Sequence, residues 1–113
     1  MERETQIKAM ASDVRLRALR LLAEPETHFG HQWSADPVEF GVCMGMIAEA
    51  LGIAQPTVSR HLDLLKQAGF ITVRRHQKWS YCRRDETAIA DYLDWLAGHV
   101  RAQTRPGQTR RAS

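Results

Sequence analysis

The sequence has 113 residues, of which 43% are hydrophobic and 26% charged, the size and composition of one globular domain. No apolar run approaches the ~20 residues that cross a bilayer, and the first residues carry mixed charge, which argues against a secretory signal. We therefore expect a cytoplasmic protein with no membrane partner. The net charge of +3 is unevenly distributed: residues 60–84 hold seven basic residues and one acid, a pattern that favours a nucleic-acid partner.

Helical periodicity marks the first part of the chain. Residues 4–23 carry apolar side chains at helical spacing, as one helix or as two if Ser12-Asp13 caps a fresh start. The stretch ends at Glu24-Pro25, because the residue before proline resists the helical region. Residues 26–40 lack periodicity and predict a loop with three aromatic residues, with a short strand over residues 38–42. A loop of this length is uncommon in a compact domain and is often functional.

Two helices in quick succession follow. The first covers residues 44–51 and stops at Gly52. The second runs from about Gln55 to Ala68, with Pro56 in its first turn and Gly69 at its end. Only three residues join the two, which is the spacing of a helix-turn-helix.

The rest of the chain predicts a hairpin and a final helix. Residues 70–83 indicate strand, basic turn and strand, and residues 86–102 form a helix with an apolar face. We assign residues 1–103 to one DNA-binding and dimerisation domain and residues 104–113 to a disordered basic tail. The expected fold is mainly α with a small β-hairpin wing, a winged helix-turn-helix.

The second helix of the pair is the predicted DNA-reading element. Its apolar stripe of Val58, Leu62 and Leu65 turns hydroxyl, amide and basic side chains outward, and these groups bond base edges and phosphates in the major groove. The basic hairpin tip suits phosphate contacts beside the groove. The residues expected to contact double-stranded operator DNA are Gln55, Thr57, Ser59, Arg60, His61, Arg74, Arg75 and Lys78.

A family resemblance supports this interpretation. The run ALGIAQPTVSRHLDLLKQAGF at residues 50–70 resembles the helix-turn-helix of the ArsR/SmtB family of winged-helix repressors. The run LRALRLL at residues 16–22 and the order of elements also fit, so that the resemblance covers about residues 5–102. It implies a homodimer whose terminal helices pair, and release of DNA when an inducer binds.

The resemblance also implies where a sensor site would lie. In the family, arsenic is sensed through a Cys-x-Cys-x-x-Cys pattern; here Cys43 falls on the first position, but Gly45 and Ala48 occupy the others. The zinc-type site of the last helix begins with Asp-x-His, and Leu93 stands where that histidine belongs. Neither site is present in its family form.

Two weaker effector candidates remain. Cys43 and Cys82 are too few for a disulfide scaffold, but strand pairing would bring them together as a thiol pair or part of a metalloid site. The alternative is two inert buried thiols. His28 and His31 have a chelating spacing and are weak metal candidates beside the interpretation as ordinary surface histidines. The cofactor stays open: a thiophilic metal or metalloid acting as inducer is one option, and the fold requires none.

The sequence thus predicts a homodimeric, sequence-specific transcriptional repressor that an effector releases from its operator. The alternative is a winged-helix DNA-binding module without an inducer, whose 26–40 loop contacts a protein partner. A thiol enzyme is disfavoured, because the sequence has no Cys-x-x-Cys, no nucleophile–base motif and no glycine-rich phosphate loop.

Overall fold

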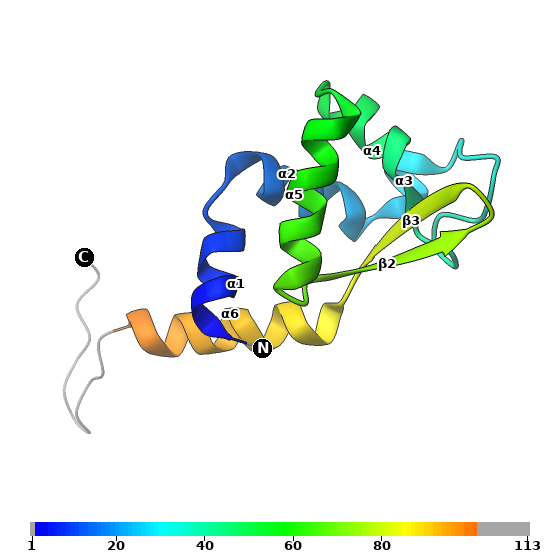
Figure 1. Ribbon diagram of the computed structural model, residues 1–113. Coiled ribbons are helices and arrows are strands. Elements are labelled where there is room, and N and C mark those ends of the chain that lie inside the picture. The colour runs from blue at the N-terminus through cyan, green and yellow to red at the C-terminus, as the bar shows by residue number, and fades with distance from the viewer. Residues whose placement is uncertain (1, 102–113) are drawn as a thin grey trace.

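The computed structural model describes residues 2–101, and the predicted 104–113 tail lies outside the described residues. Figure 1 shows a helical body from which a two-stranded hairpin extends on one side and the end of α6 on the other. In chain order the elements are α1 (Arg3–Met10), α2 (Asp13–Ala23), α3 (Pro25–Phe29), β1 (Val42–Cys43), α4 (Met44–Leu51), α5 (Gln55–Gln67), β2 (Ile71–His76), β3 (Trp79–Arg84) and α6 (Glu86–Val100).

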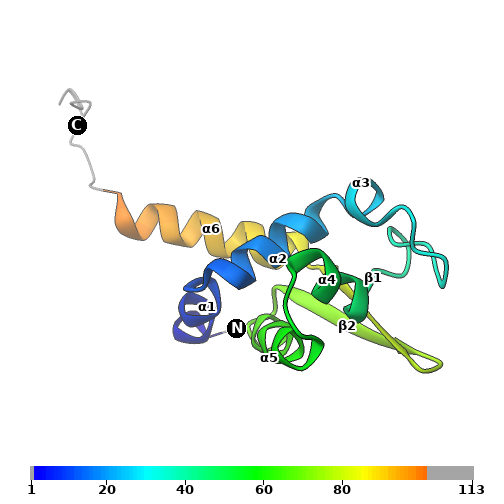
Figure 2. The same cartoon turned by 90° about the horizontal axis from the view of Figure 1, so that it is seen from above.

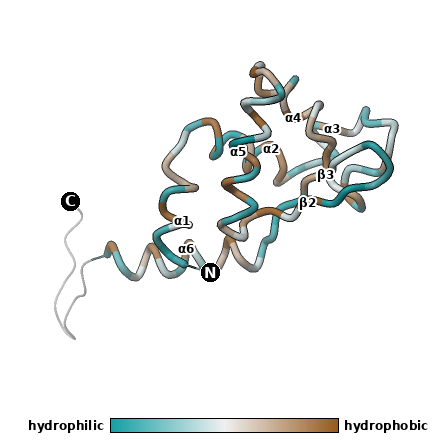
Figure 3. The backbone as a smooth tube through the Cα atoms, viewed as in Figure 1, coloured by the Kyte–Doolittle hydropathy of each residue, from teal (hydrophilic) through white to brown (hydrophobic). Residues whose placement is uncertain are grey.

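One hydrophobic core joins the helices to the base of the sheet. The strands form an antiparallel sheet in the order β1-β3-β2. Helix α5 contributes Val58, Leu62 and Leu65, which are fully buried, as the periodicity predicted. We call the distal part of the β2–β3 hairpin, residues 74–80, the wing. Figure 3 shows that this part of the hairpin is mostly hydrophilic. The predicted mainly α fold with a hairpin wing is confirmed.

Local signals account for most of the element boundaries. The Ser12 side chain accepts a hydrogen bond from the Arg15 N–H at 3.3 Å, so residues 3–23 form two helices rather than one. Gly52 and Gly69 have φ of +68° and +84° and lie just after the ends of α4 and α5.

Two expectations for the 26–40 region were wrong. Residues 25–29 form the short helix α3, because Pro25 occupies a first-turn position where its missing N–H is harmless. The strand is Val42–Cys43 instead of 38–42, because residues 36–41 close a turn in which the Phe40 N–H donates to the Asp36 carbonyl at 2.8 Å. The loop that remains, residues 30–41, is called the 30–41 segment below.

Gly41 is the residue of this segment whose backbone lies closely against β3. Its φ is +100°, and an added Cβ would lie 2.6 Å from the Cys82 carbonyl oxygen. We expect Gly41→Ala to lower the free energy of unfolding by about 2–4 kcal/mol, since the backbone is strained and the contact overpacked. Urea denaturation at fixed protein concentration measures this.

Gly52 provides the matched control. It also has positive φ, but no atom lies within 4 Å of its added Cβ. Gly52→Ala should therefore cost only about 1 kcal/mol, the penalty of the left-handed backbone alone. Equal losses in the two variants would contradict the close approach at Gly41.

The two terminal helices leave apolar side chains uncovered. Ile7 on α1 and Leu93 on α6 are about half exposed, and Val100 is 71% exposed. Figure 2 shows α6 passing beneath α2 and continuing past the body, away from the wing. No helix within residues 2–101 is long and apolar enough to cross a membrane.

Candidate nucleic-acid interface

The outer face of α5 presents most of the residues predicted to read DNA. Gln55, Thr57 and Arg60 are exposed and Ser59 is half-buried. The residue at the N-cap is Ala54, whose side chain makes no capping hydrogen bond. The Thr57 N–H donates to the Ala54 carbonyl at 3.0 Å and Pro56 has no N–H, so the first turn of α5 offers an incoming anion mainly the positive end of its dipole.

His61 differs from its neighbours on α5. Its ring is half-buried, and its Nδ1 lies 2.9 Å from the Arg15 Nη1 of α2. The same guanidinium donates to the Ala9 carbonyl at 2.6 Å and to the Lys8 carbonyl at 2.9 Å. Because arginine only donates, the His61 Nδ1 is the acceptor, and only Nε2 remains for another partner. No local signal in the sequence indicates this contact across 46 positions.

The wing carries the other predicted contacts. Arg74, Arg75 and Lys78 are exposed, and no carboxylate within residues 2–101 lies within 4.0 Å of any of them. The Arg74 guanidinium carbon lies 4.2 Å from the centre of the Phe40 ring. The Lys78 Nζ lies 5.4 Å from the Trp79 ring centre. These cations are not engaged in ion pairs inside the described chain.

A hollow of about 320 Å³ lies between α5 and the wing. The residues that line it come from the starts of α4 and α5 and from the hairpin, and none is acidic: Cys43, Met44, Gly45, Gln55, Arg75, Lys78, Trp79 and Ser80. The start of α4, like that of α5, has no side-chain cap. The cationic side chains and the uncapped start of α4 make this hollow suitable for a phosphate group. Trp79 and Ser80 were not predicted as site residues and no motif marks them, while Gly45 was named only as the position where the second cysteine of the family pattern is missing.

The two cysteines are neighbours in the sheet, but they face different ways. Val42 pairs with Cys82 and Cys43 pairs with Tyr81, so the predicted proximity of these two strand segments is confirmed. Consecutive strand residues point to opposite faces, which directs the two side chains away from each other. Cys43 lines the hollow beside α5, whereas Cys82 lines a different one. A functional role for the pair stays a prediction.

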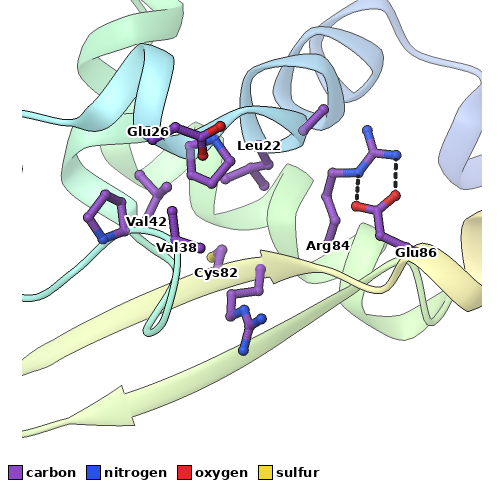
Figure 4. Close-up of a pocket in the computed structure, with 11 residues that line it drawn as sticks. Leu22, Glu26, Val38, Val42, Cys82, Arg84 and Glu86 are labelled. Atoms are coloured by element: carbon purple, nitrogen blue, oxygen red, sulfur yellow. Dashed lines mark hydrogen bonds and ion pairs between the residues drawn. The ribbon is translucent and has the colours of Figure 1, made fainter.

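The hollow beside Cys82 has a volume of about 250 Å³ and lies between α2, α3 and β3. Figure 4 shows Leu22, Val38, Val42 and Cys82 around it, with Glu26 at one margin and the Arg84–Glu86 ion pair at another. The Arg84 Nε donates to Glu86 Oε2 at 2.8 Å. Burial, and to a smaller degree the neighbouring Cys43, raises the pKa of the Cys82 thiol to about 12.

Cys82 should therefore be unreactive in the folded protein, because the thiolate is the nucleophile. In a Cys43→Ser variant, we expect Ellman's reagent to leave Cys82 unlabelled at pH 8 and to label it fully in urea. Labelling of the folded variant as fast as in urea would contradict this.

The same shift makes a pH prediction. The unfolded chain loses the thiol proton near the ordinary pKa of 9.0, and the folded chain only near 12. The contribution of the protonated Cys82 thiol to the free energy of unfolding is thus complete below pH 9 and is lost as the pH rises toward 12. Denaturation curves should show that Cys82→Ala loses less stability than the parent protein across this alkaline range.

Within residues 2–101, no cluster of further metal-ligating side chains surrounds the two weak metal candidates, His28 and His31. His28 lies exposed on α3 with its ring edge-on to Phe29, and His31 is exposed at the start of the 30–41 segment. Residues 2–101 contain no group of three or more His, Cys, Asp or Glu side chains placed to hold a metal ion.

Comparison with known proteins agrees with this geometry. A family model described as "Bacterial regulatory protein, arsR family" matches residues 42–73. The chain is 38% identical over 93 residues to YbzH, an uncharacterized HTH-type transcriptional regulator of Bacillus subtilis, covering 82% of this chain and 93% of the relative. It is 34% identical over 56 residues to the transcriptional repressor SdpR of Bacillus subtilis, covering 50% of this chain and 62% of that protein.

A solved structure shows the same fold. The homodimeric winged helix-turn-helix DNA-binding domain from Mycobacterium bovis aligns with a TM-score of 0.60 and 24% identity, over 88% of this chain and 86% of that one. The predicted winged helix-turn-helix architecture is thereby confirmed.

Proposed function

This chain belongs to the ArsR family of bacterial regulatory proteins, and on that premise we propose that it is a homodimeric transcriptional repressor that leaves its operator DNA when an effector binds. It is a DNA-binding regulator rather than an enzyme, because the family and the relatives that it matches are transcriptional regulators.

One observation carries the DNA-binding role. The uncapped starts of α4 and α5 and the wing cations Arg75 and Lys78 line one hollow that no acidic residue lines, and the exposed face of α5 continues from Gln55 at its edge. A recognition helix presents its N-terminal residues to base edges, and nearby cations neutralise phosphates. We assign Thr57, Ser59 and Arg60 to contacts in the major groove of DNA, and Arg75 and Lys78 to contacts with its phosphate backbone.

The homodimer is supported by the uncovered apolar side chains of the terminal helices. Leu93 and Val100 on α6 and Ile7 on α1 are exposed in the single chain. Pairing of these helices about a two-fold axis would bury them and set two recognition helices ~34 Å apart, one turn of DNA.

Effector release is the part of the proposal that depends on Cys43. Cys43 is a buried residue, 7% exposed, and it is one of the residues that line the hollow between α5 and the wing. A thiophilic metalloid or thiol-reactive species bound there would occupy the space that the DNA backbone needs.

Gel shifts on the DNA upstream of the gene test the proposal. We expect a specific complex that resists a scrambled competitor and weakens as salt rises. The assay is repeated with arsenite, zinc, copper, peroxide and persulfide, each on the parent protein and on a Cys43→Ser variant. Absence of a specific complex would overturn the repressor function, and an unchanged response in Cys43→Ser would overturn the role of this thiol.

A further inference from the structure

We propose that the 30–41 segment is a brace that holds the wing in its DNA-binding position, with Phe40 as its main positioning residue. The inference rests on the proposed function, because it concerns how the wing meets DNA.

The wing needs support beyond its base. Ile71, Val73 and Cys82 attach the base of the hairpin to the core, but residues 74–78 are exposed. An isolated two-stranded hairpin is only marginally stable in water. Its distal half would therefore move relative to α5 unless another element held it.

The 30–41 segment contacts this distal half. Cross-strand pairs join Arg74 to Tyr81 and His76 to Trp79, which places these four residues on the hairpin face opposite Val73 and Cys82. The Phe40 ring centre lies 5.4 Å from that of His76 and 6.0 Å from that of Tyr81. Core and segment thus hold the hairpin from opposite faces, and Figure 1 shows the chain after α3 running beside it.

A second aromatic contact lies nearer the tip. Trp33 meets Trp79 edge to face, with ring centres 6.1 Å apart and an interplanar angle of 84°. Trp33 remains 84% exposed with this contact in place, so it supports the wing less than the half-buried Phe40 does. Edge-to-face pairs of this kind contribute beyond the area that they bury.

The segment is itself fixed to the body, which a brace requires. The buried Gln32 amide accepts a hydrogen bond from the Cys43 N–H at 2.7 Å and donates to the Gly41 carbonyl at 3.1 Å and the Ala35 carbonyl at 2.8 Å. Its two ends are therefore joined to each other and to β1. Phe40 therefore connects the wing to a segment that is itself hydrogen-bonded to the body of the protein.

Phe40 also orients a predicted DNA contact. The Arg74 guanidinium lies over the Phe40 ring in a cation–π contact. Arg74 forms no ion pair with a carboxylate within residues 2–101, so its nitrogen donors remain available for DNA. Holding Arg74 in place before DNA arrives lowers the conformational entropy lost on binding.

The test is a set of Phe40 variants measured for operator affinity. We expect Phe40→Ala to weaken binding roughly tenfold, from the combined loss of the ring contacts and the cation–π contact. Phe40→Tyr keeps the ring and should bind as the parent does. Val38→Ala, on the same segment and without a ring contact to the wing, is the control and should also bind normally. Circular dichroism and sedimentation confirm fold and dimer; if Phe40→Ala does not fold, Phe40→Leu replaces it.

A double-mutant cycle separates a brace from a direct DNA contact. Arg75 pairs with Ser80 on the opposite hairpin face, so it has no ring contact with Phe40. If Phe40 acts through the wing, Phe40→Ala should lose part of its effect in an Arg75→Ala background, where Arg74 and Lys78 remain, and keep all of it in a Ser59→Ala background. Full additivity with Arg75→Ala would overturn the brace.

Hydrogen exchange gives a readout that does not depend on DNA. The amides of residues 74–80 should exchange faster in Phe40→Ala than in the parent, while those of α5 stay unchanged. Unchanged exchange in the wing, or parental operator affinity in Phe40→Ala, would overturn the brace and leave the repressor function standing. Failure of the parent protein to bind any upstream DNA would instead refute the proposed function.

Discussion

Replacing Arg60 with alanine is expected to weaken operator binding by on the order of 10²-fold while leaving the thermal unfolding of the protein unchanged. Arg60 is exposed on the N-terminal half of α5, and no carboxylate within residues 2–101 forms an ion pair with it. Each arginine contact to a base is worth ~1–3 kcal/mol, and a homodimer loses two. Fluorescence anisotropy with a labelled operator measures the change.

A charge-matched control comes from the same helix. Lys66→Ala removes one positive charge from the C-terminal end of α5, which recognition helices keep away from the bases. Its effect should be small and similar for operator and unrelated DNA. Equal effects of the two substitutions on operator binding would refute α5 as the reading element.

Introducing a charge at Leu93 is expected to separate the dimer. Leu93 is 50% exposed on α6, beside the buried Ile89 and Tyr92. Leu93→Glu would place two carboxylates in an apolar interface, where unpaired charge is strongly disfavoured. The variant should sediment as a monomer at micromolar concentration, and its operator affinity should fall at least ~10²-fold because two linked half-site contacts become one.

Val38→Glu is the control for this substitution. Val38 is an apolar residue exposed to nearly the same fraction, 49%, but it lies on the 30–41 segment. The charge it introduces should leave the dimer intact. A dimeric Leu93→Glu protein would show that α6 is not the dimer interface.

Local patterns in the sequence specified the helix-turn-helix almost completely. The spacing of Val58, Leu62 and Leu65 defines one buried face of α5, and glycines with positive φ follow α4 and α5. These features depend on neighbours within a few positions along the chain, so the sequence alone predicted both the helices and the outward face that carries Arg60. The acid-poor stretch from residue 60 to 84 predicted the basic wing for the same reason.

The tertiary structure decided where the remaining candidates lie. Strand register, which a short strand of two residues cannot reveal by its own pattern, places Cys43 and Cys82 on opposite faces of the sheet. Arg15 holds His61 across 46 positions, and Phe40 reaches the wing more than thirty residues further along the chain. Such contacts depend on how separate elements pack rather than on local periodicity. The sequence therefore determined the helix that we propose reads DNA, while only the packed fold brought the 30–41 segment against the wing.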